Sequence, residues 1–232
     1  MFTFPVGFFG GSTGAGDPYW NNVVLYLPLT GTNGQTTFTD VSQYGHAITR
    51  NGNTVISTAQ FPSLTGVGSS AYFDGNGDSL SVSSSAVFSL GTGDFTIEFW
   101  AYLNTIDNFD TIYIHGNNTG TIQLFFVGGK LRYNNNLVAA ILDTVTIIPT
   151  GQWIHLAIVR YSGTARWYIN GLLDSTATDL TNWPTPLAAL TLGRDPVNSG
   201  RDINGYLSHL RQTKVARYTT NFTPPTAPFP IG

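Results

Sequence analysis

Short runs of β-branched and aromatic residues, separated by Gly, Asn, Asp and Ser, dominate the pattern along this chain. Residues 95–102 show it clearly, because Phe95, Ile97 and Phe99 occupy every second position, which is typical of a strand with one buried face. No segment of ten or more residues carries a 3.6-residue apolar stripe, and the best helical candidate is one turn near residues 213–217. The expected strands cover residues 23–29, 71–74, 79–82, 95–102, 121–127, 130–133, 153–161, 165–169, 190–192 and 203–211.

Three residue pairs predict tight turns between these strands: Gly128-Gly129, Ser162-Gly163 and Asn170-Gly171. Asn-Gly is the sharpest of the three signals, because both residues tolerate the positive φ angles of a type I′ turn. Residues 153–161 are apolar on both faces, which predicts a central strand that is covered on both sides. The pattern as a whole predicts an all-β, antiparallel, two-sheet jelly-roll sandwich.

The two ends differ in composition from the middle. Residues 1–21 read as an extended Gly/Phe-rich arm, residues 22–222 as one domain, and residues 223–232 as a Pro-rich tail. Phe2, Phe4, Phe8 and Phe9 would expose a large apolar area on a free arm, so we expect the arm to contact a sister subunit or another partner. The alternative is an edge strand that completes the domain's own sheet.

Composition narrows the function classes. Hydrophobic residues make up 41% of the chain and aromatic residues 13%, which is enough for a sizeable core. Charged residues are only 10%, the net charge is −3, and Lys130 and Lys214 are the two lysines, so the chain has no basic cluster for a nucleic-acid backbone. The absence of cysteine removes disulfides, thiolate metal sites and cysteine nucleophiles. Neither a secretory signal nor an apolar run of membrane-spanning length is visible, so we expect no membrane span.

Several segments together resemble the laminin-G-like or concanavalin A-like jelly-roll domains. They are Tyr72-Phe73-Asp74-Gly75 with Asp78-Ser79-Leu80-Ser81-Val82, Gly93-Asp94-Phe95-Thr96-Ile97-Glu98-Phe99-Trp100, Gln152-Trp153-Ile154-His155-Leu156-Ala157, Trp167-Tyr168-Ile169-Asn170-Gly171, and Gly205-Tyr206-Leu207-Ser208-His209-Leu210-Arg211. Their order and spacing match the family over roughly residues 22–230. The resemblance implies the same sandwich fold and a site for glycans or proteins on the loops or the concave face, with calcium in some members.

The ending Ala216-Arg217-Tyr218…Asn221-Phe222-Thr223-Pro224-Pro225 is similar to the form of this domain in structural proteins of tailed phages. This resemblance implies a virion component, such as a head decoration, fibre or spike, that is made in the host cytoplasm and adheres to a host surface. A secreted, extracellular bacterial lectin-like module is the alternative, and a degenerate glucanase is the third candidate.

The carboxylate inventory argues against an enzyme. Glucanases of this fold need a pair of carboxylates on one strand, and Glu98 is the only glutamate of the chain. At two-residue spacing it has Thr96 and Trp100 as neighbours, so we expect Glu98 to be a solvent-side residue on a core strand. His155 lies in an apolar strand and is expected to be a hydrogen-bonded structural histidine. We therefore expect no catalytic residue.

Calcium is the one cofactor to weigh. Asp74 and Asp78 bracket a Gly-Asn-Gly turn and supply the oxygen ligands that calcium prefers. The resemblance implies a further acidic residue near the start of the last strand, where this chain has Ser208 and His209. Asp74 and Asp78 are therefore candidate metal ligands, with the alternative that they are turn residues that accept backbone N–H groups.

Exposed aromatic residues beside amides are the features that favour glycan binding, because sugar rings stack on aromatic faces and form hydrogen bonds at their edges. The loop residues Asn182 and Trp183, the arm junction Tyr19 and Trp20, and the amides Asn117 and Asn118 are the candidate ligand-binding residues. Loop aromatics serve subunit contacts equally well. Trp100, Trp153 and Trp167 lie on expected strands and are assigned to the core.

Overall fold

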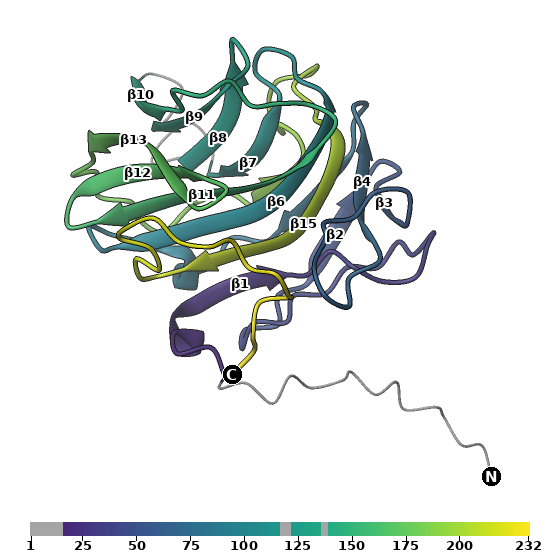
Figure 1. The fold of residues 1–232 in the computed structure, drawn as a ribbon, viewed down its shortest axis with the longest axis horizontal. Coiled ribbons are helices and arrows are strands. Elements are labelled where there is room, and N and C mark those ends of the chain that lie inside the picture. Colours follow the sequence, from purple (N-terminus) through teal and green to yellow (C-terminus); the bar gives the residue numbers. More distant parts are fainter. Residues whose placement is uncertain (1–15, 117–121, 136–138) are drawn as a thin grey trace.

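The computed structural model describes residues 16–116, 122–135 and 139–232. Within them the chain forms the expected all-β sandwich of two antiparallel sheets (Figure 1). The two short helical turns are the 3-10 helices η1 (Trp20–Asn22) and η2 (Ala86–Phe88), and residues 213–217 form a strand end and a bend instead of the expected helical turn.

The eight-stranded sheet has the order β13-β12-β11-β6-β15-β4-β3, and β1 also pairs with β15. Its strands are β1 (Val23–Leu27), β3 (Val55–Ser57), β4 (Ser70–Asp74), β6 (Phe95–Thr105), β11 (Trp153–Tyr161), β12 (Thr164–Ile169), β13 (Leu172–Thr178) and β15 (Asn204–Thr213). One edge of β15 pairs with β4 along its first half and with β1 along its second half, while the other edge pairs with β6.

The seven-stranded sheet has the order β10-β9-β8-β7-β14-β5-β2. Its strands are β2 (Ile48–Asn51), β5 (Ser79–Val82), β7 (Thr111–His115), β8 (Ile122–Val127), β9 (Lys130–Asn135), β10 (Ala139–Asp143) and β14 (Leu190–Leu192). The turn that Asp74 and Asp78 bracket therefore carries the chain from β4 in one sheet to β5 in the other.

The three predicted hairpin turns are confirmed. Ser162 and Gly163 have φ angles of 48° and 71°, Asn170 and Gly171 of 48° and 77°, and Gly128 and Gly129 of 57° and 74°. Positive φ at both central positions matches the right-handed twist of the flanking strands, which explains why these pairs close the β11–β12, β12–β13 and β8–β9 hairpins.

The main core lies between the sheets. Phe95, Ile97 and Phe99 point into it, as their alternation predicts, and Trp167 lies there as well, fully buried. The apolar faces of the two sheets pack against each other, so the sandwich excludes water from a single large cluster of side chains.

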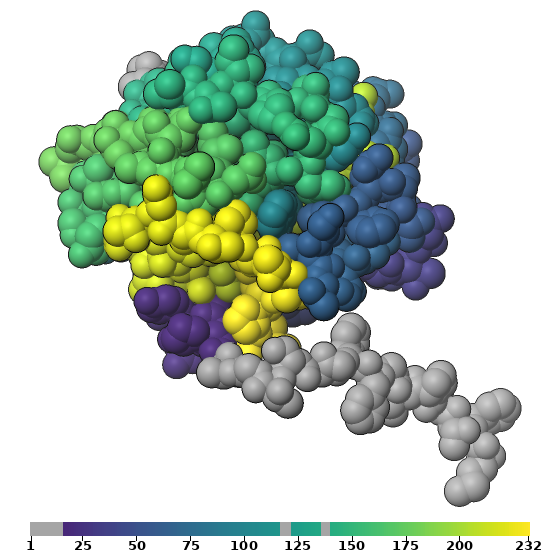
Figure 2. All heavy atoms as spheres, viewed as in Figure 1, coloured from purple at the N-terminus to yellow at the C-terminus, as the bar shows by residue number. Residues whose placement is uncertain are grey.

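A second layer covers part of the outer face of the eight-stranded sheet. Residues 214–232, which we call the C-terminal segment, cross in front of this sheet (Figure 1). In Figure 2 the same segment (yellow) covers part of the face, with the purple start of the described chain beneath it. Tyr218 and Phe222 pack on Ala157, Val159 and Tyr168, which buries both faces of β11 as its sequence predicts.

Glu98 and Arg211 form the centre of a buried ionic network beneath this segment. The Nε and Nη2 atoms of Arg211 lie 2.9 and 2.7 Å from Oε1 of Glu98, and its Nη1 lies 3.0 Å from Oδ2 of Asp17. Arg217 donates to both carboxylate oxygens of Asp17, at 3.0 and 2.6 Å. The Tyr218 hydroxyl donates to Oε2 of Glu98 at 2.8 Å, and the ring of His155 lies 3.3 Å from the same oxygen.

The prediction that Glu98 faces solvent is wrong, because its exposed fraction is 0%. Strand alternation correctly places it on the outer face of β6, but the C-terminal segment closes over that face. Burial alone would raise the pKa of Glu98, but the charge of Arg211, with contributions from His155 and Arg217, outweighs it and holds that pKa well below its usual range. His155, expected to be a hydrogen-bonded structural histidine, is fully buried, and its Nε2 lies 3.3 Å from Oε2 of Glu98.

Replacing Glu98 with Gln tests the network. Gln keeps the shape but leaves Arg211 and Arg217 with one anion fewer, and breaking a buried ion pair costs about 3–5 kcal/mol in the free energy of unfolding. Because the pKa of Glu98 is lowered, its contribution is present above the ordinary pKa of 4.5 and is lost as the pH falls, so the difference from wild type should shrink in acid. Chemical denaturation from pH 3 to 8 measures both effects.

A matched control is Asp143→Asn, which breaks the partly exposed ion pair with Arg132, whose Nε and Oδ1 atoms lie 2.7 Å apart. An exposed pair contributes under about 1 kcal/mol. An E98Q variant no less stable than D143N at pH 7 would refute the central role of Glu98.

The pKa of Asp110 is shifted in the opposite direction to that of Glu98. Asp110 is almost fully buried, and its Oδ2 accepts the backbone N–H of Asp107 at 2.8 Å. Burial, helped by the charges of Asp107 and Asp202, raises its pKa to about 6. The folded state therefore holds this proton more tightly than the unfolded state, and wild-type stability should fall as the pH rises from about 4 to about 6.

We therefore expect Asp110→Asn, which keeps an acceptor for the Asp107 N–H, to be more stable than wild type at pH 7.5 by about 1–2 kcal/mol. The gain should vanish below pH 4, where both proteins are neutral at this position. Thermal melts across this range measure it, and an equal stabilisation at pH 3.5 and 7.5 would contradict the titration of Asp110 as its cause.

Candidate functional site

Four aromatic side chains stand in one register row across the outer face of the eight-stranded sheet. Tyr72 on β4 pairs with Tyr206 on β15, Tyr206 with Tyr102 on β6, and Tyr102 with Trp153 on β11. We call these four residues the aromatic row. Each is partly exposed, unlike the core aromatics on the inner face.

The rings of the aromatic row touch in sequence. The ring centroids of Tyr72 and Tyr206 are 4.8 Å apart, those of Tyr206 and Tyr102 are 5.9 Å apart, and those of Tyr102 and Trp153 are 5.9 Å apart. Such contacts are favourable for aromatic pairs and hold each ring in place. With strands about 4.8 Å apart, the row extends over about 14 Å.

A close approach of β15 to β6 supports the row from beneath. Gly205 precedes Tyr206, and a Cβ atom at this glycine would collide with the carbonyl oxygen of Tyr102 and lie 2.9 Å from Cα of Leu103. The strands can therefore pack this closely only with glycine at the position. The sequence Gly205-Tyr206 thus sets Tyr206 directly beside Tyr102.

Amide and carboxylate side chains lie two positions from the row on three of its strands, and Asn53 joins them from the turn between β2 and β3. The Nδ2 atom of Asn104 donates to Oδ1 of Asn204 at 2.7 Å, and Nδ2 of Asn53 donates to Oδ2 of Asp74 at 3.1 Å. We call these four residues the polar edge. They offer donors and acceptors beside the aromatic rings, which is the combination that sugar rings need.

The aromatic row contains no Asp, Glu, His, Lys or Arg side chain. Burial raises the pKa of Tyr206, and the nearby hydroxyls of Tyr72 and Tyr102 raise it further. The row itself consists of neutral side chains, and the nearest charge of the polar edge is the carboxylate of Asp74. The surface is therefore apolar along its middle and rich in hydrogen-bonding groups along one side.

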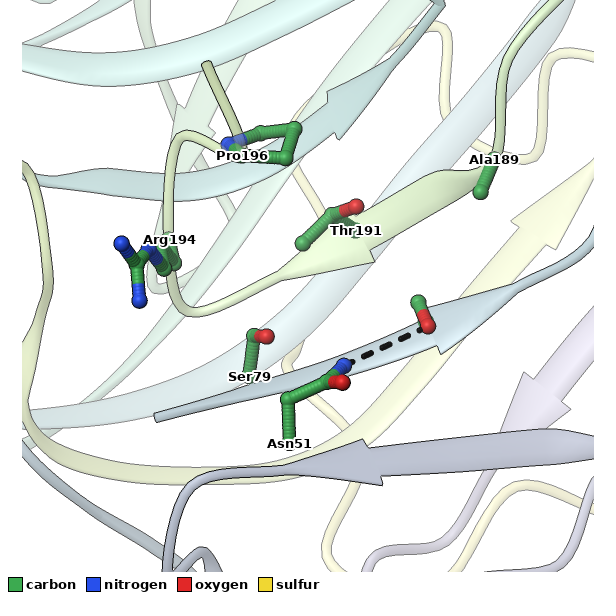
Figure 3. A pocket seen from close by; sticks show the side chains of 7 residues that line it. Asn51, Ser79, Ala189, Thr191, Arg194 and Pro196 are labelled. Carbon is green, nitrogen blue, oxygen red and sulfur yellow. Dashed lines mark hydrogen bonds between the residues drawn. The ribbon is translucent and has the colours of Figure 1, made fainter. Parts of the chain in front are cut away.

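A second candidate lies on the other sheet. A shallow depression of about 360 Å³ opens over β2, β5 and β14 (Figure 3), and five of its seven lining residues are polar. It is lined by Asn51, Ser79, Ser81, Ala189, Thr191, Arg194 and Pro196. The Nδ2 atom of Asn51 donates to Oγ of Ser81 at 3.5 Å, and Nε of Arg194 lies 3.3 Å from Oδ1 of Asp202. Its lining has no aromatic face on which a sugar ring could stack.

Trp183 does not lie on the surface, so the prediction that its ring is exposed is wrong. Its exposed fraction is 2%, and its ring packs in the core 5.9 Å from the ring of Tyr133. The loop is held inward because Trp183 exchanges backbone hydrogen bonds with Gly91 and because the buried Arg160 donates to the carbonyl of Thr181. The neighbouring Asn182 is exposed.

Tyr19 and Trp20 have different surroundings. Tyr19 is 39% exposed, and the guanidinium of Arg217 lies 5.3 Å from its ring centroid. Trp20 packs beside Val23, Tyr26 and Phe229. These residues, together with the buried Asp17, belong to the folded body although the sequence places them in the arm.

The remaining candidates of the arm and the amide pair fall outside the described residues. These are Phe2, Phe4, Phe8 and Phe9, and Asn117 and Asn118. Of the expected ligand-binding residues that the structure describes, none lies in the aromatic row.

The carboxylates of Asp74 and Asp78 accept backbone N–H groups in and beside the turn that these residues bracket. Asp78 accepts the backbone N–H groups of Asn53 and Asp74, at 2.6 and 3.0 Å, and Asp74 accepts that of Asn76 at 2.8 Å. Over the described ranges, no group of three His, Cys, Asp or Glu side chains is arranged to hold a metal ion. The oxygens that calcium would need already accept protein hydrogen bonds.

Trp100 and Trp153, assigned to the core from the sequence, are half-buried on the outer face, and that assignment is wrong for both. The signal was present in the alternation itself, because Trp100 and Tyr102 share the face of Glu98, opposite Phe95, Ile97 and Phe99. In the same described part of the chain, no helix is long and apolar enough to cross a membrane.

Comparison with known proteins identifies a family with this fold. The family model of the concanavalin A-like lectin/glucanases superfamily matches residues 74–219. No curated protein sequence matches the chain significantly.

Solved structures with the same architecture include three instructive ones. Domain 4 of AbnA, a GH43 extracellular arabinanase from Geobacillus stearothermophilus solved in complex with arabinotriose, has a TM-score of 0.65 at 19% identity and covers 84% of this chain and 93% of its own. The binding domain of Paraclostridial Mosquitocidal Protein 1 has a TM-score of 0.68 at 15% identity, over 86% of this chain and 50% of its own.

The third is a botulinum neurotoxin type C structure, described as showing that cell entry depends on interaction with two ganglioside molecules. It has a TM-score of 0.62 at 16% identity, over 86% of this chain and 49% of its own. The chain thus spans about half the length of the toxin structures that it matches. At these identities the likeness shows a shared fold.

Proposed function

We propose that this chain, which belongs to the concanavalin A-like lectin/glucanases superfamily, binds a glycan at the aromatic row and does so without catalysing a reaction. The single observation that carries the proposal is four partly exposed aromatic rings in register, with the polar edge beside them. Structures of the same fold that were solved with arabinotriose or discussed with gangliosides support it.

The chemistry of Glu98 supports a non-catalytic role. A glycosidase acid must hold a proton at working pH, and a retaining enzyme places a second carboxylate about 5 Å away across the scissile bond. Glu98 is instead fully buried, and its pKa is held below the usual range by arginines. Its place beneath the C-terminal segment gives a sugar no access to it.

We expect Trp153→Ala and Tyr72→Ala each to lower glycan affinity at least tenfold, because each removes one stacking face from an end of the row. A tenfold loss corresponds to about 1.4 kcal/mol. A glycan array screened with wild type and the variants provides the ligand, and calorimetry with that ligand measures the loss.

Tyr44→Ala is the matched control, because Tyr44 is 45% exposed and lies outside the row. It should bind like wild type. Glycan binding that survives both row variants, or that Tyr44→Ala abolishes, would place the site elsewhere. If no glycan binds to wild type, the proposal is wrong.

We further propose that the glycan-binding chain is a virion component of a tailed phage, as a head decoration, fibre or spike. The support is the resemblance of the ending Ala216-Arg217-Tyr218…Pro224-Pro225 and the Phe/Gly-rich composition of residues 1–15, which suits contact with sister subunits or other virion proteins. Host-surface glycans would then be its ligands.

Immunogold electron microscopy of particles and cell fractions tests this location, with antibody raised against the purified chain. We expect gold on the head or tail of phage particles. Label confined to the secreted fraction would favour the alternative, an extracellular bacterial lectin-like module. Release of reducing sugar from β-glucan would favour the third candidate, a glucanase.

A further inference from the structure

The C-terminal segment limits the aromatic row on one side. Phe222 contacts the β12–β13 turn, where its backbone N–H donates to the carbonyl of Gly171, and its ring lies 5.8 Å from that of His155. The segment next reaches the loop before β4, where the carbonyl of Thr226 accepts the backbone N–H of Thr65. The strands β6 and β15 lie between these two anchors, so the segment crosses both (Figure 1).

The first anchor stands at the level of Trp100 on the sheet. Asn170, beside the first anchor, donates its backbone N–H to the carbonyl of His155, and His155 pairs with Trp100, which pairs with Ser208. This level is two residues, or about 7 Å, from the aromatic row along the strands. Trp100 is half-buried there, and its Nε1 is buried.

The polar edge limits the row on its other side, again two residues along the strands. Asn104 and Asn204 are hydrogen-bonded to each other there, and Asp74 is bound by Asn53. The open part of the face is therefore a strip that follows the row across four strands. It is narrow along the strands, about 14 Å between its two borders, and it has one ring on every strand.

Ring spacing and charge define what fits this strip. Neighbouring centroids are 4.8 to 5.9 Å apart, which is about the length of one sugar residue in an extended chain. The row carries no charged side chain, and the polar edge contributes the carboxylate of Asp74, which repels anions. A branch would meet the C-terminal segment on one side or the amides on the other.

We infer that the aromatic row binds a linear, unbranched and uncharged oligosaccharide of three to four residues, which lies across the strands and contacts the rings of the row in turn. This inference rests on the proposed glycan binding and adds the class, length and direction of the ligand.

The experiment measures affinity by calorimetry for cello-, xylo- and α-1,5-arabino-oligosaccharides of one to six residues, and for a sialylated trisaccharide. We expect affinity for at least one neutral series to rise at least tenfold from the mono- or disaccharide to the tetrasaccharide and then level off. The sialylated probe should bind more weakly than the neutral chain of equal length.

The two end variants test the direction. Tyr72 and Trp153 are three strands apart, so a disaccharide cannot reach both rings. Tetrasaccharide binding should weaken in both Trp153→Ala and Tyr72→Ala, whereas disaccharide binding should weaken in one of them at most. Tyr44→Ala again serves as the control.

The outcomes separate the two levels of the proposal. Three results would overturn the inference and leave glycan binding intact. The first is an affinity that does not change with chain length, and the second is a preference for the sialylated probe. The third is an array ligand whose binding needs Trp153 while none of the three linear series binds. An array on which wild type binds nothing would overturn both.

Discussion

A buried ion pair between Glu98 and Arg211 lies at the centre of the eight-stranded sheet. It joins the two central strands β6 and β15, and through Asp17, Arg217 and Tyr218 it binds the start of the described chain and the C-terminal segment to the same point. Two carboxylates face two guanidinium groups, so the charges balance where water is excluded. Such a group is stable only when complete, because each ion taken from water costs several kcal/mol that its partners must offset.

The position of the C-terminal segment has consequences on both of its sides. Beneath it, Tyr218 and Phe222 cover the outer face of β11 with apolar side chains. Ala157 and Val159 are therefore shielded from water although they point away from the main core. Beside it, the cover stops and the aromatic row remains partly exposed. One face of a single sheet thus carries a closed ionic and apolar layer next to an open aromatic surface. Arg217, Tyr218 and Phe222 hold this layer in place.

The sequence predicted those parts of the fold that depend on interactions between residues close together in the chain. Turn pairs such as Asn170-Gly171 and the alternation around Ile97 depend on neighbours in the chain, and both are confirmed. Strands β2, β3, β7 and β10 were not predicted, and β13 was expected only through the turn that precedes it. The strands β2, β3, β10 and β13 lie at the ends of the two sheets, where β2 and β13 have mostly polar sequences and β3 has only three residues. The apolar run of β7, which lies between β8 and β14, was overlooked. Glu98 was misplaced because the residues that bury it follow it by more than a hundred positions.

The candidate site was misplaced for a related reason. Trp183 was assigned to the surface because it lies in a loop, and Trp153 to the core because it lies on a strand, yet the structure reverses both. A loop held by Arg160 can turn its ring inward, and a strand has an outer face whose exposure depends on what crosses it. The chemistry sought, aromatic rings beside amides, was correct in kind, and the registers of four strands decide where it occurs.

The distance along the chain between Asp17 and Arg217, 200 residues, bears on how the protein is made. During synthesis β6 leaves the ribosome long before β15. The strand β6 therefore cannot pair along both of its edges until more than a hundred further residues have been translated. Until then Asp17 and Glu98 lack the arginine partners that they have in the folded protein. Folding should therefore conclude in one late step, slow for the size of the domain, as expected when distant segments must meet.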